Sequence, residues 1–244
     1  MEPLLSGKNV LVTGGTGALG TALVRKFCRA GAAVFFTHYR SEARARELEA
    51  LGARGFPLDL KDSPALEVFH KAVRNELKVL HVLIHNAATT HDAMIHNLDE
   101  AGWDEVMTVN LKAPYLLTKK LLFPLFKAKP GKIFFIVSRA ALSGIYGAAN
   151  YAASKAGLVG LAKSLAQELG RKEVLVNCVN PGFMKSRMTE SLPGAVLARN
   201  LEESPLGRCS NPDEVADFIV YLSSGQMTQV TGQVFHYESR KTNL

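Results

Sequence analysis

Seven short apolar runs, separated by longer amphipathic stretches, constrain the fold of this chain more than any other feature. The runs span about residues 9–13, 33–37, 55–58, 79–85, 132–138, 174–179 and 233–237, and the helix-like stretches span about 18–30, 42–52, 63–77, 104–127, 150–170 and 212–223. Apolar runs without strict alternation are typical of parallel strands that are buried on both faces. The pattern therefore predicts an α/β fold, a single doubly wound parallel sheet of the Rossmann type with about seven strands and helices on both faces.

No linker, internal repeat or low-complexity tract divides the 244 residues. A chain of this length with 47% hydrophobic residues can fill one large core. We therefore predict one domain over residues 1–244. The region at about 183–210 follows the sixth predicted strand and is punctuated by proline and glycine, so we expect a substrate lid there.

Composition and charge exclude several classes of protein. No apolar stretch reaches the roughly 18 residues that a membrane-spanning helix needs. The first residues also lack the pattern of a signal peptide, so we expect a cytoplasmic protein that does not bind membranes. The net charge of +7 favours an anionic partner, but no compact basic run is interleaved with aromatic residues, and we expect no nucleic acid.

The three cysteines, Cys28, Cys178 and Cys209, are far apart in the sequence and lack the spacing of metal ligands. The sequence therefore predicts no metal site. Free cysteines are often simply buried, which favours inert thiols here, and a reactive thiol is the alternative.

A glycine-rich turn follows the first predicted strand and opens a helix. Its sequence is Thr13-Gly14-Gly15-Thr16-Gly17-Ala18-Leu19-Gly20. Glycine lets the backbone approach a pyrophosphate, and the N-terminus of the helix offers free N–H groups to it. A strand before the turn and a helix after it favour dinucleotide binding over a purely structural turn. We expect cofactor contacts from Gly14, Thr16, Gly17, Ala18, Leu19 and Gly20.

The end of the second predicted strand bears on the choice of nicotinamide cofactor. It reads Thr37-His38-Tyr39-Arg40-Ser41, with no carboxylate before Glu42. An acidic residue at this place would bind the ribose 2′-hydroxyl of NAD and repel a 2′-phosphate. Arg40 can pair with a 2′-phosphate through two hydrogen bonds, and His38 and Ser41 can add to them. The sequence therefore predicts NADP(H), with a solvated surface cation as the alternative reading of Arg40.

Two further turns follow predicted strands. Asp59 and Leu60 come after the third strand, where the carboxylate is placed either to accept from the adenine amino group or to cap a turn. Asn86, Ala87 and Ala88 come after the fourth strand, where small residues let the backbone pass close to a ribose. We expect both turns to contact the cofactor.

Tyr151 and Lys155 stand four residues apart in a predicted helix, so their side chains share one face. A fixed ammonium group favours the phenolate and lowers the pKa of a tyrosine towards the range of a general acid–base. Ser138, at the end of the fifth predicted strand, is placed to hydrogen-bond a substrate oxygen. A Tyr-x-x-x-Lys pair is common by chance, and the dinucleotide turn is what favours catalysis. We predict a hydride from the nicotinamide and a proton from Tyr151.

Together these motifs resemble the short-chain dehydrogenase/reductase family over essentially the whole chain. The resemblance implies that Asn110 completes a tetrad with Ser138, Tyr151 and Lys155 and holds a water that relays protons through Lys155. It implies that Tyr151 and Lys155 also contact the nicotinamide ribose. Further cofactor contacts are implied for the segment that holds the carboxamide, namely Pro181, Gly182, Phe183, Met184 and Ser186.

The chain departs from the family pattern at a few positions. Ala18 and Ala88 replace glycines, and Ser186 stands where a threonine is usual. Each alanine adds only one methyl group, so we expect cofactor binding to persist. The C-terminal residues 235–240, Phe-His-Tyr-Glu-Ser-Arg, replace Val-Asp-Gly-Gly. In the family this end packs at a subunit interface, so the change bears on the packing of the homotetramer that the resemblance implies.

Within the family, residues 150–157 and 176–183 are most similar to 3-oxoacyl-[acyl-carrier-protein] reductases. This similarity implies NADPH-dependent reduction of a 3-oxoacyl thioester to the 3-hydroxyacyl form, as in fatty-acid synthesis. In those enzymes basic residues beside the active-site entrance dock the acyl carrier protein. The corresponding positions are Lys129 and Lys172, with Arg171 adjacent, and ordinary solvated lysines are the alternative.

Two other functions remain open at this point. One is the same chemistry on an acyl-CoA, a polyketide or a small alcohol or ketone. The other is a catalytically silent protein that kept the fold for binding. The intact set of Asn110, Ser138, Tyr151 and Lys155 disfavours the silent protein, because folding does not require all four.

Overall fold

The computed structural model describes residues 4–186, 189 and 194–240. This part of the chain forms one seven-stranded sheet in the order β3-β2-β1-β4-β5-β6-β7, with every neighbouring pair parallel. The strands are β1 (Asn9–Val12), β2 (Ala33–His38), β3 (Arg54–Pro57), β4 (Val82–His85), β5 (Gly131–Ile136), β6 (Val174–Asn180) and β7 (Val234–His236). The predicted doubly wound sheet is confirmed. The strand order reverses between β1 and β4, where sheets of this type bind their ligands.

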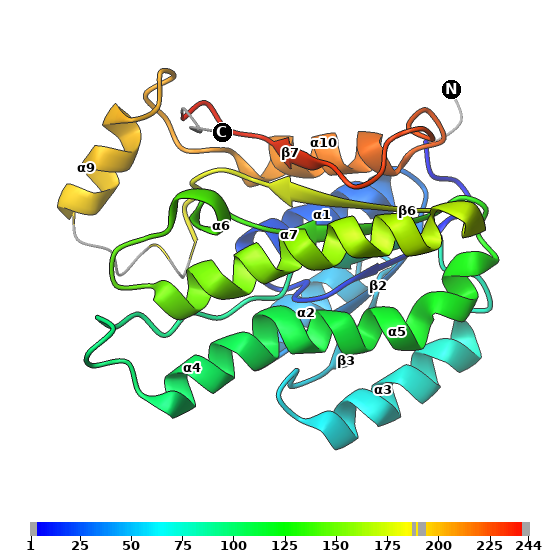
Figure 1. Ribbon diagram of the computed structural model, residues 1–244. Coiled ribbons are helices and arrows are strands. Elements are labelled where there is room, and N and C mark those ends of the chain that lie inside the picture. The colour runs from blue at the N-terminus through cyan, green and yellow to red at the C-terminus, as the bar shows by residue number, and fades with distance from the viewer. Residues whose placement is uncertain (1–3, 187–188, 190–193, 241–244) are drawn as a thin grey trace.

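Helices cover both faces of the sheet (Figure 1). One face carries α1 (Ala18–Arg29), α2 (Glu42–Glu49) and α10 (Pro212–Ser223). The other face carries α3 (Ser63–Glu76), α5 (Ala113–Phe126) and α7 (Ala149–Leu169). In the described part of the chain, α4 (Glu100–Met107), the short α6 (Ala140–Ser143) and α9 (Gly194–Glu202) lie in the connections after β4, β5 and β6, and a 3₁₀ turn (Gly170–Lys172) follows α7.

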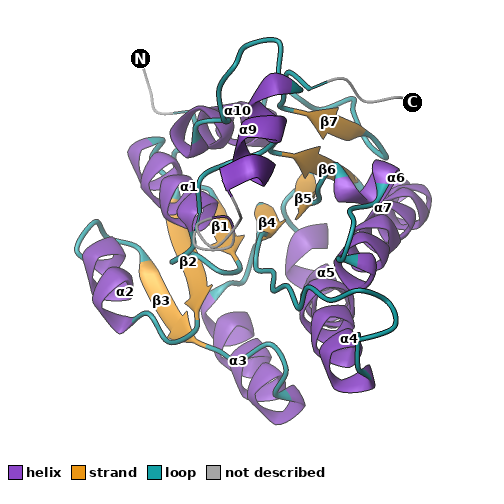
Figure 2. Cartoon of the chain, turned by 90° about the vertical axis from the view of Figure 1, so that its left-hand side faces the viewer, coloured by secondary structure: helices purple, strands orange, loops and turns teal. Residues whose placement is uncertain are grey.

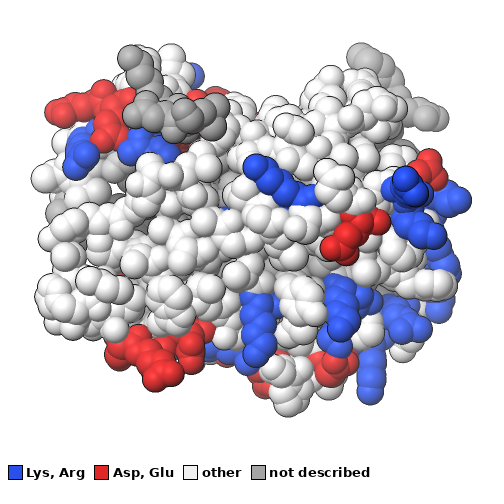
Figure 3. Space-filling view, in the orientation of Figure 1, with Lys and Arg blue, Asp and Glu red and all other residues white. Residues whose placement is uncertain are grey.

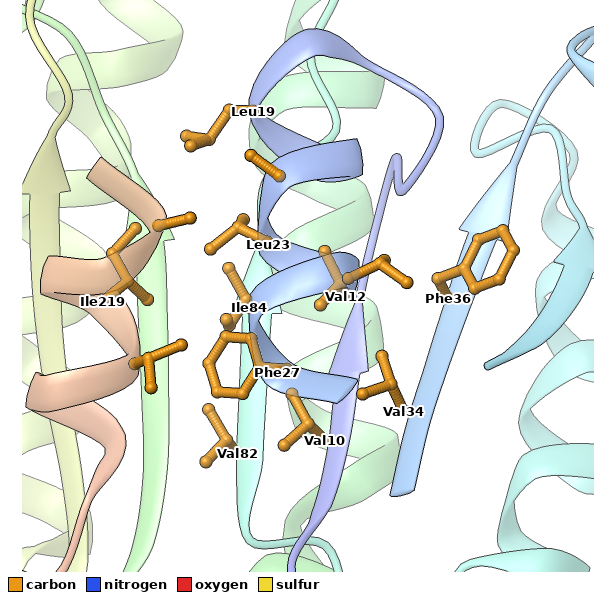
Figure 4. Close-up of a cluster of buried hydrophobic side chains, with 14 of the residues drawn as sticks. Val10, Val12, Leu19, Leu23, Phe27, Val34, Phe36, Val82, Ile84 and Ile219 are labelled. Atoms are coloured by element: carbon orange, nitrogen blue, oxygen red, sulfur yellow. The ribbon is translucent and has the colours of Figure 1, made fainter. Parts of the chain in front are cut away.

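Alternating strand residues divide the core into two layers. Val10 and Val12 of β1 face the layer built on α1, whereas Leu11 between them faces the layer built on α5 and α7. Figure 4 shows the first layer, in which Phe27 of α1 lies beside Val10 and Val82, and Ile219 of α10 belongs to the same cluster. The strand residues of both layers are mostly apolar, although β5 also buries Lys132 and β6 buries Asn177, and the runs therefore read as nearly continuous hydrophobic segments. This burial holds the carboxyl ends of the strands at a common edge.

Two predicted elements differ from the structure. The helix predicted at about 104–127 is interrupted by a π turn (Thr108–Lys112) between α4 and α5, and it begins earlier, after Asp99. The Asp99 carboxylate accepts from the Gly102 N–H (2.7 Å) and so caps α4. The fourth strand, predicted from residue 79, begins at Val82, because the Leu80 N–H bonds the Pro124 carbonyl instead of a strand.

The region at about 183–210, predicted as a substrate lid, contains α9, and part of it (187–188 and 190–193) lies outside the described residues. None of the helices in the described part of the chain is both long and apolar enough to cross a membrane.

Candidate active site

A cavity of about 1400 Å³ lies at the carboxyl ends of the strands, the edge that faces the viewer in Figure 2. It is lined by the segments that follow β1 to β6, so the sheet brings together residues that are far apart in the sequence. Every predicted cofactor residue except Arg40 lines this cavity, together with Ser138. These residues are Gly14, Thr16, Gly17, Ala18, Leu19, Gly20, His38, Ser41, Asp59, Leu60, Asn86, Ala87, Ala88, Tyr151, Lys155, Pro181, Gly182, Phe183, Met184 and Ser186.

The glycine-rich turn is shaped by close backbone contacts. Gly14 has a φ of +67°, and a Cβ there would lie 2.8 Å from the Cα of Ala87. A Cβ at Gly20 would lie 2.1 Å from the Gly14 carbonyl oxygen. Helix α1 then begins with no side-chain cap and no acidic residue in its first turn. Its free N–H groups at the cavity fit a bound pyrophosphate.

Side-chain hydrogen bonds tie this turn to β4. The Asn86 amide donates to the carbonyls of Thr13 (3.0 Å) and Gly14 (3.1 Å). In return, the Thr13 hydroxyl oxygen accepts from the N–H groups of Asn86 (3.0 Å) and Ala87 (3.1 Å). Asn86 therefore positions the turn through its side chain. Thr13 was not among the predicted site residues, although a hydroxyl at a strand end is a recognisable signal.

Arg40 and Arg44, which both follow β2, lie differently. Arg40, the predicted phosphate ligand, is exposed, does not line the cavity, and holds its guanidinium 4.7 Å from the ring centroid of Tyr39. Its positive φ of 53° belongs to the bend that turns the chain into α2. Arg44, on the first turns of α2, does line the cavity and donates to the Thr16 carbonyl (3.4 Å). The guanidinium that lies beside the glycine-rich turn thus belongs to Arg44 and not to Arg40, the residue that the sequence predicted.

Two other predicted cofactor residues, Asp59 and His38, differ in their contacts within the protein. One carboxylate oxygen of Asp59 accepts from the Lys61 N–H (2.9 Å), as the turn-capping alternative requires, while the residue still lines the cavity. His38 is buried, and its Nδ1 has no hydrogen-bond partner in the described part of the chain. Its role towards a phosphate stays a prediction.

Ser138, Tyr151 and Lys155 meet at the floor of the cavity. The Ser138 hydroxyl oxygen accepts from the Ala140 N–H (3.2 Å), which leaves its own proton free to donate. The Lys155 ammonium donates to the Ile136 carbonyl (2.8 Å) and lies 5.7 Å from the centroid of the Tyr151 ring. The predicted face shared by Tyr151 and Lys155 is therefore present in α7.

The electrostatics of this group differ from the expectation. Burial raises the pKa of Tyr151, the nearby Ser138 hydroxyl acts in the opposite direction, and the charge of Asp92 raises the pKa further. Burial also lowers the pKa of Lys155 to about 8. The expected lowering of the Tyr151 pKa by Lys155 is not found, because the cost of burying a phenolate is the larger effect.

Asn110 lies in the π turn between α4 and α5, fully buried and outside the cavity lining. Its side-chain oxygen accepts from the Thr89 N–H (2.9 Å), and its amide donates to the Thr89 carbonyl (3.0 Å) and the Ser154 hydroxyl (3.1 Å). The side chain thus joins the loop after β4 to α7, one residue from Lys155. The water relay through Asn110 stays a prediction.

Several cavity residues lay outside the predicted set. Asp92, in the loop after β4, lines the cavity, and burial raises its pKa. Arg139 follows Ser138 directly, and Arg240 comes from the C-terminal segment. A carboxylate or a guanidinium just beyond a strand end was the only sequence signal for Asp92 and Arg139. Nothing in the sequence linked Arg240 to the cavity.

Two of the three cysteines, Cys28 and Cys178, fit the prediction of inert thiols. Cys178 is buried in β6, and burial raises the pKa of its thiol to about 12. Burial also raises the pKa of Cys28. Among the described residues, no three His, Cys, Asp or Glu side chains gather as a metal ion would require.

The predicted docking residues lie at the other end of the sheet. Lys129 precedes β5, and Arg171 and Lys172 precede β6, so all three stand at the amino ends of these strands. The expectation that they lie beside the entrance of the cavity is wrong for a single chain, because β5 separates them from Ser138 by about 20 Å. Figure 3 shows Lys and Arg side chains gathered at this end, over the C-terminal ends of α5 and α7.

Comparisons with known proteins cover nearly the whole chain. The family model described as "Enoyl-(Acyl carrier protein) reductase" matches residues 15–239. The chain is 36% identical to nodulation protein G of Rhizobium sp. (strain N33) over 234 residues, 95% of this chain and 96% of that protein. It is 35% identical to the 3-oxoacyl-[acyl-carrier-protein] reductase of Aquifex aeolicus over 242 residues, 97% of this chain and 98% of that protein.

A solved structure shows the same fold. The Pseudomonas aeruginosa RhlG/NADP active-site complex superposes with a TM-score of 0.90 at 29% sequence identity, and the match covers 98% of each chain. The similarity therefore extends over the cavity as well as the sheet.

Proposed function

The chain belongs to the short-chain dehydrogenase/reductase family of oxidoreductases, and from this premise we propose that it reduces a 3-oxoacyl thioester to the 3-hydroxyacyl thioester with NADPH. One observation carries the proposal: a single cavity is lined both by the glycine-rich turn and by Ser138, Tyr151 and Lys155. Relatives named 3-oxoacyl-[acyl-carrier-protein] reductase, 35% and 36% identical to this chain, support the choice of substrate.

NADPH, when bound, supplies the hydride that adds to the C3 carbonyl carbon. Tyr151 supplies the proton, and its raised pKa keeps the hydroxyl protonated and ready to donate. The Ser138 hydroxyl donates to the carbonyl oxygen as negative charge develops on it. The Lys155 ammonium, 5.7 Å from the Tyr151 ring centroid, stabilises the phenolate that remains. Tyr151 and Ser138 thus act on the oxygen of the substrate, and Lys155 acts on the phenolate that remains on Tyr151.

The choice of NADP(H) is supported by the end of β2. No carboxylate occurs there before Glu42, and Arg44 brings a guanidinium to the cavity beside the Thr16 carbonyl. The similar RhlG structure is an NADP complex. We assign the contact with the 2′-phosphate to Arg44, with Arg40 reaching it only if its side chain leaves Tyr39.

The mouth of the cavity fits an acyl chain. Ile145 and Tyr146, after α6, and Val196 of α9 are exposed apolar residues that line it. Exposed apolar groups gathered at a cleft are typical of a surface that binds an apolar ligand. A chain attached to a thioester would cover them.

We extend the proposal to an oligomer, the homotetramer of the family resemblance. Trp103 of α4 and Tyr115 and Phe123 of α5 are exposed large hydrophobic residues on one side of the molecule. A carrier protein docked on Lys129, Arg171 and Lys172 is too far from this chain's own cavity, so it would serve the cavity of another copy. Sedimentation equilibrium tests the assembly, and a monomer at micromolar concentration would contradict it.

The function is tested by following NADPH oxidation with 3-oxoacyl thioesters of several chain lengths, on both acyl carrier protein and CoA. We expect turnover that falls about 10²- to 10⁴-fold in Tyr151→Phe. Thermal unfolding of the variant should match that of the wild type, because only one hydroxyl is lost.

The same screen separates the alternatives. Turnover of small ketones or alcohols without turnover of any 3-oxoacyl thioester would assign the chain to another substrate class. Turnover on CoA thioesters alone would exclude the carrier protein as the partner. A protein that binds NADPH yet turns over nothing would be a binding protein.

A further inference from the structure

Helix α9 forms one wall of the cavity near its mouth. Figure 2 shows it in front of the carboxyl ends of the strands. The wall consists of five side chains from α9 and the residue after it, namely Ala195, Val196, Arg199, Asn200 and Glu203. Two of these residues, Asn200 and Glu203, are bound by arginines from distant parts of the chain.

Arg139 binds α9 from the catalytic side. It directly follows Ser138, and its Nη2 donates to Glu203 Oε2 (2.7 Å). The other oxygen of Glu203 accepts from Arg199 Nε (3.0 Å), within the same helical segment. Both carboxylate oxygens are therefore used, and the C-terminal end of α9 is connected to the residue beside the reacting group.

Arg240 binds α9 from the C-terminal side. Its side chain is only 10% exposed, one guanidinium nitrogen donates to Asn200 Oδ1, and the other donates to Glu238 Oε2 (2.8 Å). The guanidinium also lies 5.6 Å from the ring centroid of Phe183, which lines the cavity. A fixed, mostly buried guanidinium with two hydrogen-bond partners contributes more than an exposed ion pair does.

The neighbours of Arg240 strengthen this connection. The hydroxyl groups of Ser239 and Ser204 are hydrogen-bonded, which adds a contact just beyond α9. The side chain of Glu238 is only 2% exposed and lies against the loop after β6, where a Cβ on Gly182 would lie 2.8 Å from the Cβ of Glu238. Residues 238–240 therefore link α9 to the segment 181–183, and glycines at these positions would offer no side chain for any of these contacts.

We propose that Arg139 and Arg240 are positioning residues, which hold α9 at the mouth of the cleft through Glu203 and Asn200 and so set the shape of the substrate site. The proposal rests on the proposed function for the identity of the substrate. It explains the unusual C-terminal residues 238–240 through contacts within their own chain.

The effect on the reaction follows from what α9 contributes. Ala195 and Val196 face the cavity, whereas the glycine-rich turn and the pair of Tyr151 and Lys155 belong to other elements. A displaced α9 therefore weakens binding of the acyl substrate and leaves proton transfer and NADPH binding intact. KM for the thioester rises, and kcat stays close to that of the wild type.

The test compares Arg139→Leu and Arg240→Leu with Lys26→Leu as a matched control. Lys26 forms an ion pair of the same 2.7 Å length with Asp217 of α10, away from the cavity. In both arginine variants we expect KM for the 3-oxoacyl thioester to rise about tenfold, and amide hydrogen exchange in residues 194–203 to quicken about tenfold. The NADPH dissociation constant stays unchanged in Arg139→Leu, because the Arg139 side chain binds α9 through Glu203, and the Lys26 variant behaves like the wild type.

Conservative and paired variants complete the test. Arg240→Lys keeps a charged donor and should restore most of the affinity for the thioester. Asn200→Leu combined with Arg240→Leu should cost no more than the single change at Arg240, because the two residues share one contact. If Arg240→Leu is poorly folded, Arg240→Gln replaces it, because glutamine keeps a hydrogen-bond donor without the charge. The exchange rates of residues 194–203 in Arg240→Gln should then be faster than in Arg240→Lys.

Unchanged exchange in residues 194–203 in both arginine variants, or an equal rise of KM in Lys26→Leu, overturns the proposal. The exchange measurement does not depend on the substrate. A wild-type protein that turns over no 3-oxoacyl thioester therefore contradicts the proposed function alone, while the exchange rates still decide whether the arginines hold α9.

Discussion

Two buried lysines lie at opposite ends of β5, Lys132 on the strand itself and Lys155 on α7 against its carboxyl end, and their hydrogen bonds differ in number. Lys132, near the amino end, is 3% exposed and donates to three carbonyls, those of Leu222 (2.9 Å), Ser224 (2.6 Å) and Met227 (2.7 Å). Lys155 of α7, near the carboxyl end, is 2% exposed and donates to one carbonyl, that of Ile136 (2.8 Å). Burial lowers the pKa of both to about 8.

Burial and a shifted pKa therefore do not distinguish a structural lysine from a catalytic one. What distinguishes them is the number of N–H donors of the ammonium group that already have an acceptor within the protein. An ammonium group has three donors, and at Lys132 all three are used to bind the end of α10 and the turn after it. At Lys155 the remaining donors face the cavity beside Tyr151, so they are available to a ligand and to the phenolate.

Removal of the Lys155 ammonium group should give the largest effect. In Lys155→Met, the phenolate of Tyr151 loses its stabilising charge, and we expect kcat/KM for NADPH-dependent reduction to fall about 10²- to 10⁴-fold. Steady-state kinetics measure the fall, and Lys132→Met is the matched control that should keep its turnover per folded molecule. Equal losses of activity in both variants would contradict the comparison.

Removal of the Lys132 ammonium group should instead cost stability. In Lys132→Met, three carbonyl groups at the end of α10 lose their donor, and we expect the free energy of unfolding to fall by about 3 kcal/mol. Urea denaturation followed by circular dichroism measures this change. The free energy of unfolding should fall less in Lys155→Met, since one carbonyl, that of Ile136, loses its donor. A larger loss in Lys155→Met than in Lys132→Met would reverse the assignment.

The pH dependence of the reaction should report Lys155 and not Lys132. The pKa of Lys155 is lowered to about 8, so its ammonium is charged below that pH and neutral above it. Since the raised pKa of Tyr151 keeps the hydroxyl protonated, kcat/KM for reduction should be level below about pH 8 and fall about tenfold per pH unit above.

The control for this profile is Lys155→Arg. A guanidinium stays charged at every pH that the protein tolerates, so the fall above about pH 8 should disappear in whatever activity this variant keeps. A wild-type profile that stays level to pH 10 would show that the charge of Lys155 does not matter to the reaction.

The same distinction between cations that are already bound within the protein and cations that are available to a ligand applies to Arg40 and Arg44 after β2, with a smaller effect. Arg44 faces the cavity, and Arg40 lies over Tyr39. We expect Arg44→Gln to weaken NADPH binding about tenfold and to leave NADH binding unchanged. Arg40→Gln should change NADPH binding less. Titration of both variants with NADPH and NADH checks the order, and a larger loss in Arg40→Gln would restore Arg40 as the phosphate ligand.

The sheet and most of the site could be predicted because each depends on local pattern. Apolar runs place the seven strands within three residues of their observed bounds, and the glycine-rich turn follows β1 as expected. The spacing of Tyr151 and Lys155 places them on one helix face in any helix. The start of α4 was missed because the predicted helix was placed by its apolar periodicity. The observed helix begins instead after a polar cap, Asp99.

The sequence by itself determined the fold class, the turn that shapes the cavity, and the helix face that Tyr151 and Lys155 share, because strands, turns and helix faces follow from neighbours along the chain. Tertiary structure alone decided which cations are available. Whether a lysine or arginine is engaged depends on carbonyls, rings and carboxylates that are distant in sequence, as Lys132 with Met227 and Arg240 with Asn200 show. Tertiary structure also decided the pKa of Tyr151, because burial is a property of the packed protein and not of the residues beside it.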